Sequence, residues 1–316
     1  MKKIAIGQAG GPTAVLNESL VGFLDEIDQD VTGVLQGFQG LVEGRFIEMH
    51  PTVRDRAKAS RRVSGAWLGA GRYALSEADM AQAVGNLKKA GIDTLVFIGG
   101  NGTMWTLRAL SKMAARMNVD LQVIGIPKTV DNDLAETDHA PGFGSAARYV
   151  AHAAYDMSKD LEAMRNFEQV RIIETMGRNV GWLAAASGLL KVHENEGPHL
   201  IYLPEQKHDA VKVVASIREA MKEYGFASVV VSEGVKLDAR TVTRKIVNGR
   251  EVLGGISEQL AELAEAELGV VARADNLGMN QRSSQLACSN QDRIEAYQAG
   301  VKAAKLVREG VSDVMV

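Results

Sequence analysis

Short apolar runs alternate along most of the chain with segments in which apolar residues recur at helical spacing. Such runs are typical of strands buried in a parallel sheet, and the segments between them are typical of amphipathic helices that cover it. The alternation therefore predicts an α/β fold. Strands are expected at residues 3–9, 31–35, 94–98, 121–126, 170–173, 199–203, 228–231 and 270–277, and helices at about 15–24, 78–87, 103–117, 146–164, 210–224, 256–268 and 292–308.

Glycine-rich loops directly follow two of these strands. The first strand leads into Gly10 and Gly11, and the third leads into Gly-Gly-Asn-Gly-Thr at residues 99–103. Backbone N–H groups of such loops, together with the N-terminus of the following helix, can bind phosphate oxygens. The loops therefore predict a phosphate site, with a tight turn at Gly10–Gly11 and an N-cap role for Thr103 as the alternatives.

Other glycines occur outside these two loops. Gly37, Gly40 and Gly44 are interpreted as turns. Residues 64–73 form a glycine-rich loop that carries Arg72. Its guanidinium could hold a phosphate oxygen, or it could be a solvated cation that pairs with surface carboxylates.

The most polar loop follows the strand at residues 121–126, at the strand end where ligands bind in open α/β sheets. It contains Lys128, Thr129, Asp131 and Asp133. Two carboxylates beside a lysine and a hydroxyl exceed what folding of a short loop requires, although an Asx-rich turn that caps the next helix is the alternative. This loop is therefore the first candidate for catalysis.

The composition narrows the class of protein. A chain of 316 residues can hold about two domains of the usual size. Its formal net charge of −3 gives no overall attraction for nucleic acid or an anionic membrane. The single cysteine, Cys288, excludes an intrachain disulfide and a zinc site built on several thiolates. No apolar stretch is as long as a membrane span, so we expect a soluble cytoplasmic protein.

The first glycine loop matches neither of two common nucleotide-binding fingerprints. Residues 10–13, Gly-Gly-Pro-Thr, lack the Gly-x-Gly-x-x-Gly spacing, and the chain has no good match to the P-loop signature. A dehydrogenase built on a Rossmann domain is therefore disfavoured.

Taken together, the loops resemble the phosphofructokinase family over nearly the whole chain. Each motif is weak alone, but all occur in the family's order and approximate spacing. NAD kinases and diacylglycerol kinases are similar in the Gly-Gly-x-Gly-Thr loop, without a match to the Asp131 and Arg282 motifs. The matching motifs are Gly10-Gly11 with Asn17, residues 99–103, 127–133 and 142–146, Met176-Gly177-Arg178, Glu233-Gly234 and Gln281-Arg282.

The resemblance implies a more specific fold. We expect two Rossmann-like three-layer lobes with largely parallel sheets and the active site in the cleft between them. Residues 1–138 and about 281–304 would form the donor-binding lobe. Residues about 139–280 and about 305–316 would form the sugar-phosphate-binding lobe.

The resemblance assigns the transfer chemistry to the polar loop. Asp131 matches the general base that takes the proton from the sugar 1-hydroxyl as it attacks the donor's terminal phosphoryl group, a role that suits an ionised carboxylate. Thr129 would contact the transferring group, and Lys128 would add positive charge. Asp133 is expected to be a substrate-binding residue that helps to hold metal-bound water or orients the loop.

The other expected site residues divide between donor and sugar. Arg273 and Arg282 would clamp the 6-phosphate of fructose 6-phosphate through charge-assisted bonds. In the family, the arginine that matches Arg273 comes from a neighbouring subunit, so a homodimer or homotetramer is expected. Donor contacts are expected from Gly11, Arg72, Gly102 and Thr103, and the other sugar contacts from Met176, Gly177, Arg178 and Glu233.

Two donor-site positions indicate different donors. Typical bacterial ATP users have glycine at the positions of Gly102 and Lys128, whereas pyrophosphate users have aspartate and lysine. Gly102 leaves room for the α-phosphate of ATP, and a flexible lysine can move aside, so ATP is favoured. Thr106, where ATP users often have glycine, and the Gly11-Pro12-Thr13 form of the first loop favour pyrophosphate.

The metal and sugar positions also depart from the family. Asn101 replaces a magnesium-associated aspartate, which keeps an oxygen ligand for Mg²⁺ but removes a charge. Met279 replaces a histidine or tyrosine that touches the sugar phosphate. Gln169 replaces an arginine, unless Arg171 serves instead. The preference for a 6-phosphate sugar is therefore weakened.

The basic residues of the bacterial effector site have no counterparts. Val21 and Asp25 follow the first loop, and residues 224–226 replace a lysine-rich turn. We therefore expect no control by ADP or phosphoenolpyruvate.

The sequence thus predicts a 6-phosphofructokinase that uses Mg²⁺ and makes fructose 1,6-bisphosphate from fructose 6-phosphate, as in glycolysis. ATP is the favoured donor and pyrophosphate is the alternative. A hypothesis of another class is a catalytically weak sugar-phosphate or nucleotide sensor, which the retention of Lys128, Asp131 and Asp133 disfavours.

Overall fold

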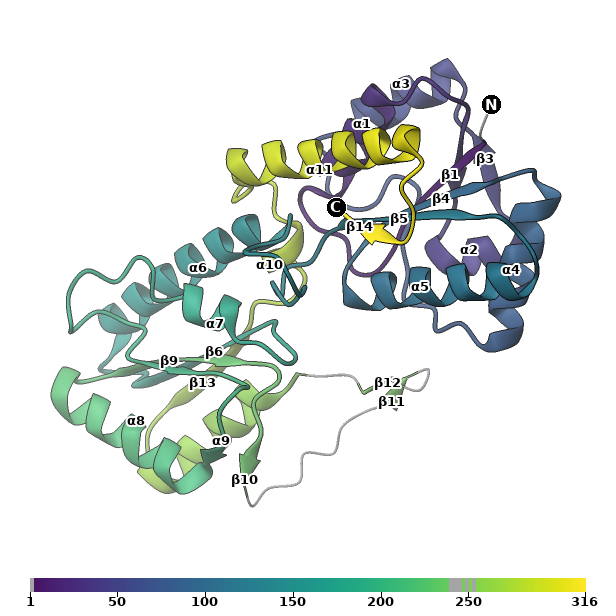
Figure 1. Cartoon of the computed structure of the whole chain (residues 1–316). Helices are drawn as coiled ribbons and strands as arrows, with labels where there is room; N and C mark the ends of the chain where they lie inside the picture. The colour runs from purple at the N-terminus through teal and green to yellow at the C-terminus, as the bar shows by residue number, and fades with distance from the viewer. Residues whose placement is uncertain (1–2, 239–245, 248–249, 252–253) are drawn as a thin grey trace. The chain divides into compact units, whose positions relative to one another are not determined.

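The computed structural model describes residues 3–238, 246–247, 250–251 and 254–316. The chain forms two compact units. The first unit comprises Met1–Val130, Leu134–Ser145 and Arg282–Val316, and the second comprises Asp131–Asp133 and Ala146–Gln281. Each unit has a mainly parallel sheet covered by helices (Figure 1), so the predicted α/β class is confirmed.

A six-stranded sheet forms the centre of the first unit, in the order β14-β5-β4-β1-β2-β3. Its strands pair in parallel, except that β3 runs antiparallel to β2. The carboxyl ends of β1, β4 and β5 are therefore adjacent along one edge of the sheet. The strands are β1 (Ile4–Gln8), β2 (Val31–Val34), β3 (Phe46–Glu48), β4 (Thr94–Gly99), β5 (Gln122–Pro127) and β14 (Val314–Met315).

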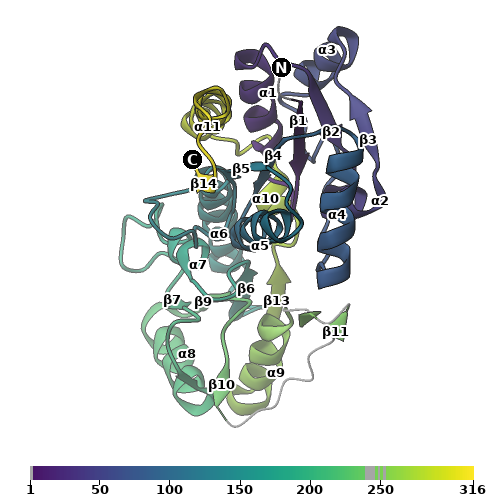
Figure 2. The same ribbon diagram turned by 45° about the vertical axis from the view of Figure 1, so that its right-hand side comes forward.

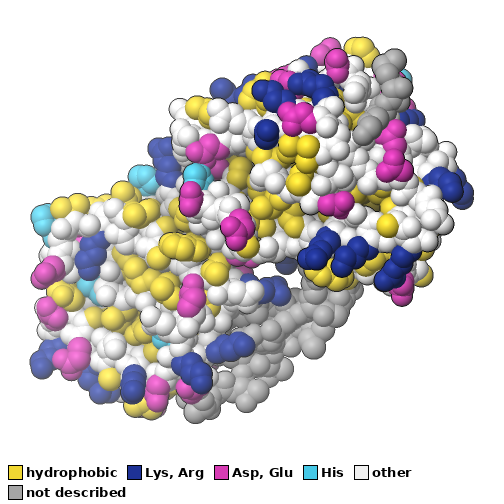
Figure 3. Space-filling model, viewed as in Figure 1, with side chains coloured by type: hydrophobic (Ala, Val, Ile, Leu, Met, Phe, Trp, Pro, Cys, Tyr) yellow, Lys and Arg dark blue, Asp and Glu magenta, His cyan; other side chains and the backbone are white. Residues whose placement is uncertain are grey.

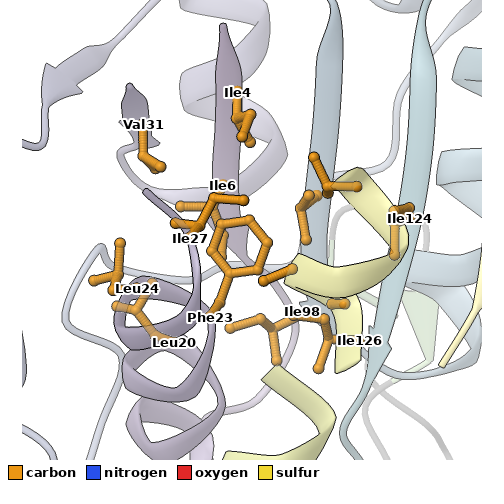
Figure 4. Packing of buried hydrophobic residues seen from close by; sticks show 14 of the residues in the cluster. Ile4, Ile6, Leu20, Phe23, Leu24, Ile27, Val31, Ile98, Ile124 and Ile126 are labelled. Atoms are coloured by element: carbon orange, nitrogen blue, oxygen red, sulfur yellow. The ribbon is translucent and has the colours of Figure 1, made fainter. Parts of the chain in front are cut away.

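Helices cover both faces of this sheet, which gives three layers (Figure 2). Alternate residues of a strand point to opposite faces. Ile4 and Ile6 accordingly pack with Phe23 in one apolar cluster (Figure 4), while Ala5 packs with Phe97 in the other. The helices are α1 (Leu16–Glu26), α2 (Gly37–Glu43), α3 (Pro51–Ala59), α4 (Glu77–Lys89), α5 (Asn101–Arg116) and α11 (Asn290–Glu309).

Two glycines let α1 and α11 approach each other closely. A Cβ atom at Gly22 would lie 2.1 Å from the carbonyl oxygen of Tyr297, and one at Gly300 would lie 2.1 Å from that of Ser19. Larger residues at either position would separate the helices. This contact fixes α11, and with it the preceding segment from Arg282, to the first unit.

A four-stranded, all-parallel sheet forms the centre of the second unit, in the order β13-β6-β9-β7. Val170 and Ile172 pack with helices α8 and α9 on one face. On the other face, Ser158 of α6 is hydrogen-bonded to Ser228 of β9 at 2.7 Å. This unit is therefore also three-layered (Figure 1).

The remaining elements belong to the second unit or to its junctions with the first. Short strands pair as β8 with β10 in parallel and β11 with β12 antiparallel. The bounds are α6 (Phe143–Met164), β6 (Val170–Thr175), α7 (Trp182–Ala186), β7 (Leu200–Tyr202), β8 (His208–Asp209), α8 (Ala210–Tyr224), β9 (Ala227–Ser232), β10 (Leu237–Asp238), β11 (Ile246–Val247), β12 (Arg250–Glu251), α9 (Ile256–Leu268), β13 (Ala272–Asn276) and α10 (Asn280–Ser283).

Two expectations from the sequence are wrong in detail. Gly44 ends α2 as a left-handed turn residue, as expected, but Gly37 and Gly40 lie inside α2, where a Cβ atom at Gly40 would lie 1.6 Å from the carbonyl oxygen of Leu35. Gly40 therefore serves close packing. Residues 305–316 belong to the first unit, because α11 continues to Glu309 and Val314 pairs with Ile124 of β5.

Charged side chains of both signs are interspersed on the face of the molecule shown in Figure 3. This distribution fits the formal net charge of −3. Among the described residues, no helix combines the length and the apolar character that crossing a membrane requires.

Candidate active site

In the first unit, backbone hydrogen bonds join the loops after three adjacent strands. Ala9 N–H donates to the Ile98 carbonyl at 2.9 Å, and Lys128 N–H donates to the Gly99 carbonyl at 3.0 Å. Gly10 N–H donates to the Gly71 carbonyl at 3.1 Å, which places the loop of Arg72 beside the first glycine loop. The loops expected to bind the donor therefore converge at one sheet edge.

Two cationic side chains meet at Gly11. Lys128 is buried and its Nζ donates to the Gly11 carbonyl at 2.8 Å. A Cβ atom at Gly11 would lie 2.4 Å from Arg282 Nη1, so this guanidinium lies directly against the glycine. The expectation that Lys128 is free to move aside does not fit this contact. Arg282, which is expected at the sugar phosphate, thus lies against the same glycine whose carbonyl accepts from Lys128.

The glycine loop at residues 99–103 opens helix α5 without a side-chain cap. Gly100 is the N-cap residue and makes no side-chain cap hydrogen bond, so the N-cap alternative for Thr103 is wrong. Thr103 is instead buried against Gly99, where a Cβ atom would lie 2.1 Å from Thr103 Oγ1. The first turn of α5 has no acidic residue. This helix N-terminus is therefore electrostatically suited to a phosphate.

Gly102 borders open space. A Cβ atom built at Gly102 would meet nothing within 4 Å, and both Asn101 and Gly102 are exposed. A donor larger than pyrophosphate therefore meets no side-chain obstruction at this position within the first unit.

A buried carboxylate that the sequence did not single out holds the loop beside Thr129. Thr129 N–H donates to the Pro141 carbonyl at 3.1 Å, and Thr129 forms an isolated parallel bridge with Gly142. Asp292 accepts from Gly142 N–H at 2.8 Å and from Ser145 N–H at 3.0 Å. Because these partners are far apart in sequence, no local pattern indicated this role.

Replacing Asp292 by alanine is expected to lower the free energy of unfolding by about 2–4 kcal/mol, because it leaves two buried N–H donors unpaired. Urea denaturation of the wild type and the variant measures the change. Asp292→Asn keeps an acceptor oxygen and should lose less stability. An alanine variant as stable as the wild type would show that the two N–H groups find other partners.

In the second unit, the turn after β6 packs on the end of β9. Gly177 has a φ of 135° and its N–H donates to Glu233 Oε1 at 3.4 Å. Ser232 Oγ donates to the Gly177 carbonyl at 2.6 Å. A Cβ atom at Gly234 would lie 1.9 Å from the Arg178 carbonyl. The two sequence motifs expected to bind the sugar are thus one packed structure.

Gln281 joins this structure to the segment before Arg282. Its Oε1 accepts from Met176 N–H at 2.9 Å, and its Nε2 donates to the Gly278 carbonyl at 2.9 Å. The sequence singled out Gln281 as part of a motif without a role. The structure gives it one, which is to hold the turn at Met176.

Asp131 influences Glu233 electrostatically. Burial raises the pKa of the Glu233 carboxyl, and the negative charge of Asp131 raises it further, while Arg178 lowers it. Three residues predicted for the site, Asp131, Arg178 and Glu233, therefore lie in one electrostatic neighbourhood of the second unit. An arginine and two carboxylates provide donors and acceptors for sugar hydroxyls.

A family model described as phosphofructokinase matches residues 3–307. The chain belongs to the phosphofructokinase family. It is therefore a phosphotransferase.

Relatives within this family differ in the donor and acceptor that their names give. The sulfofructose kinase of Alkalicoccus urumqiensis is 49% identical over 315 residues, which cover 99% of this chain and 82% of that protein. ATP-dependent 6-phosphofructokinase 3 of Streptomyces coelicolor is 31% identical over 96% of this chain and 86% of that protein. The crystal structure of a pyrophosphate-dependent phosphofructokinase from Marinobacter aquaeolei matches with a TM-score of 0.86 at 30% identity, covering 100% of this chain and 78% of that chain.

Arg171, the alternative to Gln169 for a family arginine, is held by carboxylates of its own unit. The Arg171 side chain is only 10% exposed, and its guanidinium donates to Glu168 at 2.8 and 3.0 Å and to Asp160 at 3.0 Å. Gln169 itself is bound to the backbone through both ends of its amide. These contacts favour a structural role for Arg171 over the alternative role at the sugar. Arg273 remains exposed, with 57% of its side chain accessible.

The described residues contain no group of three or more His, Cys, Asp or Glu side chains that could hold a metal ion by themselves. Mg²⁺ does not require such a group, because it is commonly held by substrate phosphates and waters with one or two protein oxygens. Asn101, on the exposed first turn of α5, and Asp133 carry suitable oxygens.

The raised pKa of Glu233 predicts a pH-dependent stability. The native state binds the proton of the Glu233 carboxyl more tightly than the unfolded chain does. The free energy of unfolding therefore falls as pH rises from the ordinary carboxyl pKa to the raised one. Glu233→Gln removes this effect and keeps an acceptor for Gly177 N–H. We expect the variant to be more stable than the wild type at pH 7.5 and to lose that advantage at pH 4, as measured by urea denaturation. An equal difference in the free energy of unfolding between variant and wild type at both pH values would contradict the raised pKa of Glu233.

Proposed function

We propose that the chain transfers a phosphoryl group to the 1-hydroxyl of a fructose that carries an anionic group on carbon 6. The preferred acceptor is sulfofructose, in which this group is a sulfonate, and fructose 6-phosphate is the second candidate. The product is the 1-phosphate ester, which is fructose 1,6-bisphosphate when the acceptor is fructose 6-phosphate.

The fixed side chain of Arg171 carries the choice of acceptor. Arg171 is bound to Glu168 and Asp160. Gln169 and Met279 stand where the family resemblance implies an arginine and a histidine or tyrosine. The site therefore offers fewer donors to the carbon-6 group. A sulfonate carries one negative charge and needs fewer cations than a phosphate dianion. The 49% identity to a sulfofructose kinase supports the same choice.

Asp131 is the general base of the proposed reaction. Its carboxylate takes the proton of the 1-hydroxyl while the oxygen forms a bond to the donor's terminal phosphorus, and the bond from that phosphorus to the leaving oxygen breaks. Lys128 and the N-terminus of α5 balance negative charge on the donor, and Thr129 contacts the transferring group. Arg178 and Glu233 hold the sugar hydroxyls.

Mg²⁺ is the proposed cofactor. It neutralises charge on the donor oxygens when it is bound, and Asn101 and Asp133 would provide protein ligands, directly or through water. The neutral amide of Asn101 predicts a weaker metal site than the aspartate that the family resemblance implies at this position.

ATP is the proposed donor because Gly102 borders open space, where an aspartate would obstruct the α-phosphate. Pyrophosphate is the second candidate, because Lys128 is buried and held on the Gly11 carbonyl, where it can bind the end of a short donor. These two residues therefore favour different donors, and both donors belong in the test.

A homodimer or homotetramer is the proposed functional form. Arg273 lies on β13, the edge strand of the second sheet, and its exposed side chain can serve the site of a neighbouring subunit.

Initial rates test the proposal. Sulfofructose and fructose 6-phosphate are each supplied with ATP and with pyrophosphate, in the presence of Mg²⁺. We expect the highest kcat/KM for sulfofructose with ATP. Higher values for fructose 6-phosphate would overturn the acceptor, and a higher value with pyrophosphate would overturn the donor. Binding of these ligands without any turnover would favour the sensor hypothesis instead.

A further inference from the structure

Glu168 is a buried carboxylate that bridges two arginines. It lies between α6 and β6 and is 2% exposed. Arg171 donates to both of its oxygens, at 2.8 and 3.0 Å. Arg273 Nε lies 3.0 Å from Glu168 Oε2. One carboxylate thus joins a buried guanidinium to an exposed one.

The strand register explains why this carboxylate is needed. Arg171 on β6 and Arg273 on β13 are direct partners in the parallel pairing, so their positive charges lie on adjacent strands. Glu168 offsets that repulsion. Asp160 and Asp275 add contacts to Arg171 at 3.0 and 3.5 Å. Arg171 is therefore a fixed support, and Glu168 transmits its position to Arg273.

The contact through Nε orients the guanidinium of Arg273, because the group is planar and its remaining nitrogens follow the direction of that bond. Gln169 stands where the family resemblance implies an arginine, and both ends of its amide are hydrogen-bonded to the backbone of Arg165 and Val271. Recognition of an anion at this sheet edge therefore depends on Arg273 and on what orients it.

We propose that Glu168 is a positioning residue for recognition of the acceptor's carbon-6 anion. Its buried carboxylate, fixed by Arg171, holds Arg273 in the orientation that binds the sulfonate or phosphate in the site of a neighbouring subunit. This inference rests on the proposed function.

Glu168→Gln tests the role, because glutamine keeps the size of the side chain and removes the charge that holds two guanidiniums. We expect kcat/KM for sulfofructose to fall about tenfold, mainly through KM, as for loss of a charge-assisted contact. With fructose, which lacks the anion, kcat/KM should change less than twofold. Asp160→Asn is the matched control, because it removes one contact to Arg171 while Glu168 still binds both arginines, and it should change both values less than twofold.

A double-mutant cycle separates positioning from a structural role. If Glu168 acts through Arg273, adding Glu168→Gln to Arg273→Ala should cause no further loss. Equal losses with sulfofructose and fructose, or full additivity with Arg273→Ala, would overturn the inference.

The dissociation constant of inorganic sulfate, measured by calorimetry without donor, gives a readout that needs no turnover. It should rise about tenfold in Glu168→Gln and change less than twofold in Asp160→Asn. If this result holds while the wild type phosphorylates neither anionic acceptor, the proposed function fails and the positioning role stands. Unchanged sulfate binding in Glu168→Gln overturns the positioning role.

Discussion

Asp131→Asn is expected to lower kcat by about a thousandfold, within the range that general-base catalysis supplies. Asparagine has nearly the same shape as aspartate, but its amide cannot accept the proton of the 1-hydroxyl. Acceptor binding, measured by calorimetry, should change less than threefold. Steady-state rates under saturating donor and acceptor give kcat.

The same substitution has a second readout that does not depend on turnover. Because the charge of Asp131 helps to raise the pKa of Glu233, removing that charge should lower the pKa of the Glu233 carboxyl toward its ordinary value. Carboxyl-selective NMR titration measures it. A variant that keeps more than a tenth of the wild-type kcat would exclude Asp131 as the base, whatever happens to Glu233.

Gly102→Asp is expected to lower kcat/KM with ATP about a hundredfold, because a carboxylate beside the α-phosphate adds bulk and like charge at the donor site. The wild-type backbone offers room for the side chain, since a Cβ atom there meets nothing within 4 Å, so the fold should be unaffected. Pyrophosphate has only two phosphoryl groups and none that corresponds to the α-phosphate of ATP. Activity with pyrophosphate should therefore change little.

Gly102→Asn is the matched control for size without charge. A smaller loss of ATP activity in this variant would show that charge repulsion contributes to the effect. Equal losses with ATP and pyrophosphate in Gly102→Asp would contradict the account, because they would place the new carboxylate against the part that both donors share.

The sheets of both units could be predicted from the sequence because buried parallel strands are continuous apolar runs. The expected strand at 94–98 and helix at 210–224 differ from β4 (Thr94–Gly99) and α8 (Ala210–Tyr224) by at most one residue at an end. Helix α2 was missed because its glycines resemble turn residues in sequence, whereas in the structure Gly40 permits close packing on Leu35. Local pattern does not distinguish these two uses of glycine.

The candidate site was predictable where its chemistry lies in local motifs. Asp131, Arg178 and Glu233 each stand in a recognisable loop, and the structure brings them within electrostatic reach of one another. Asp292 and Glu168 were missed, because their partners are distant in sequence or on a neighbouring strand.

Lys128 shows what the structure adds to a correctly selected residue. From the sequence, Lys128 counts for less than Gly102 in the choice between ATP and pyrophosphate, because a flexible lysine side chain could move aside. Its burial and its hydrogen bond to the Gly11 carbonyl strengthen the case for pyrophosphate as the second candidate donor.

The position of the transferred phosphoryl group tests the central claim most directly. Sulfofructose labelled with ¹³C at carbon 1 is incubated with the wild type, ATP and Mg²⁺, and the product is analysed by ¹³C and ³¹P NMR. The account predicts carbon–phosphorus coupling at carbon 1, and no such product with Asp131→Asn in the same time. Transfer to another hydroxyl, or donor hydrolysis without a sugar ester, would contradict it.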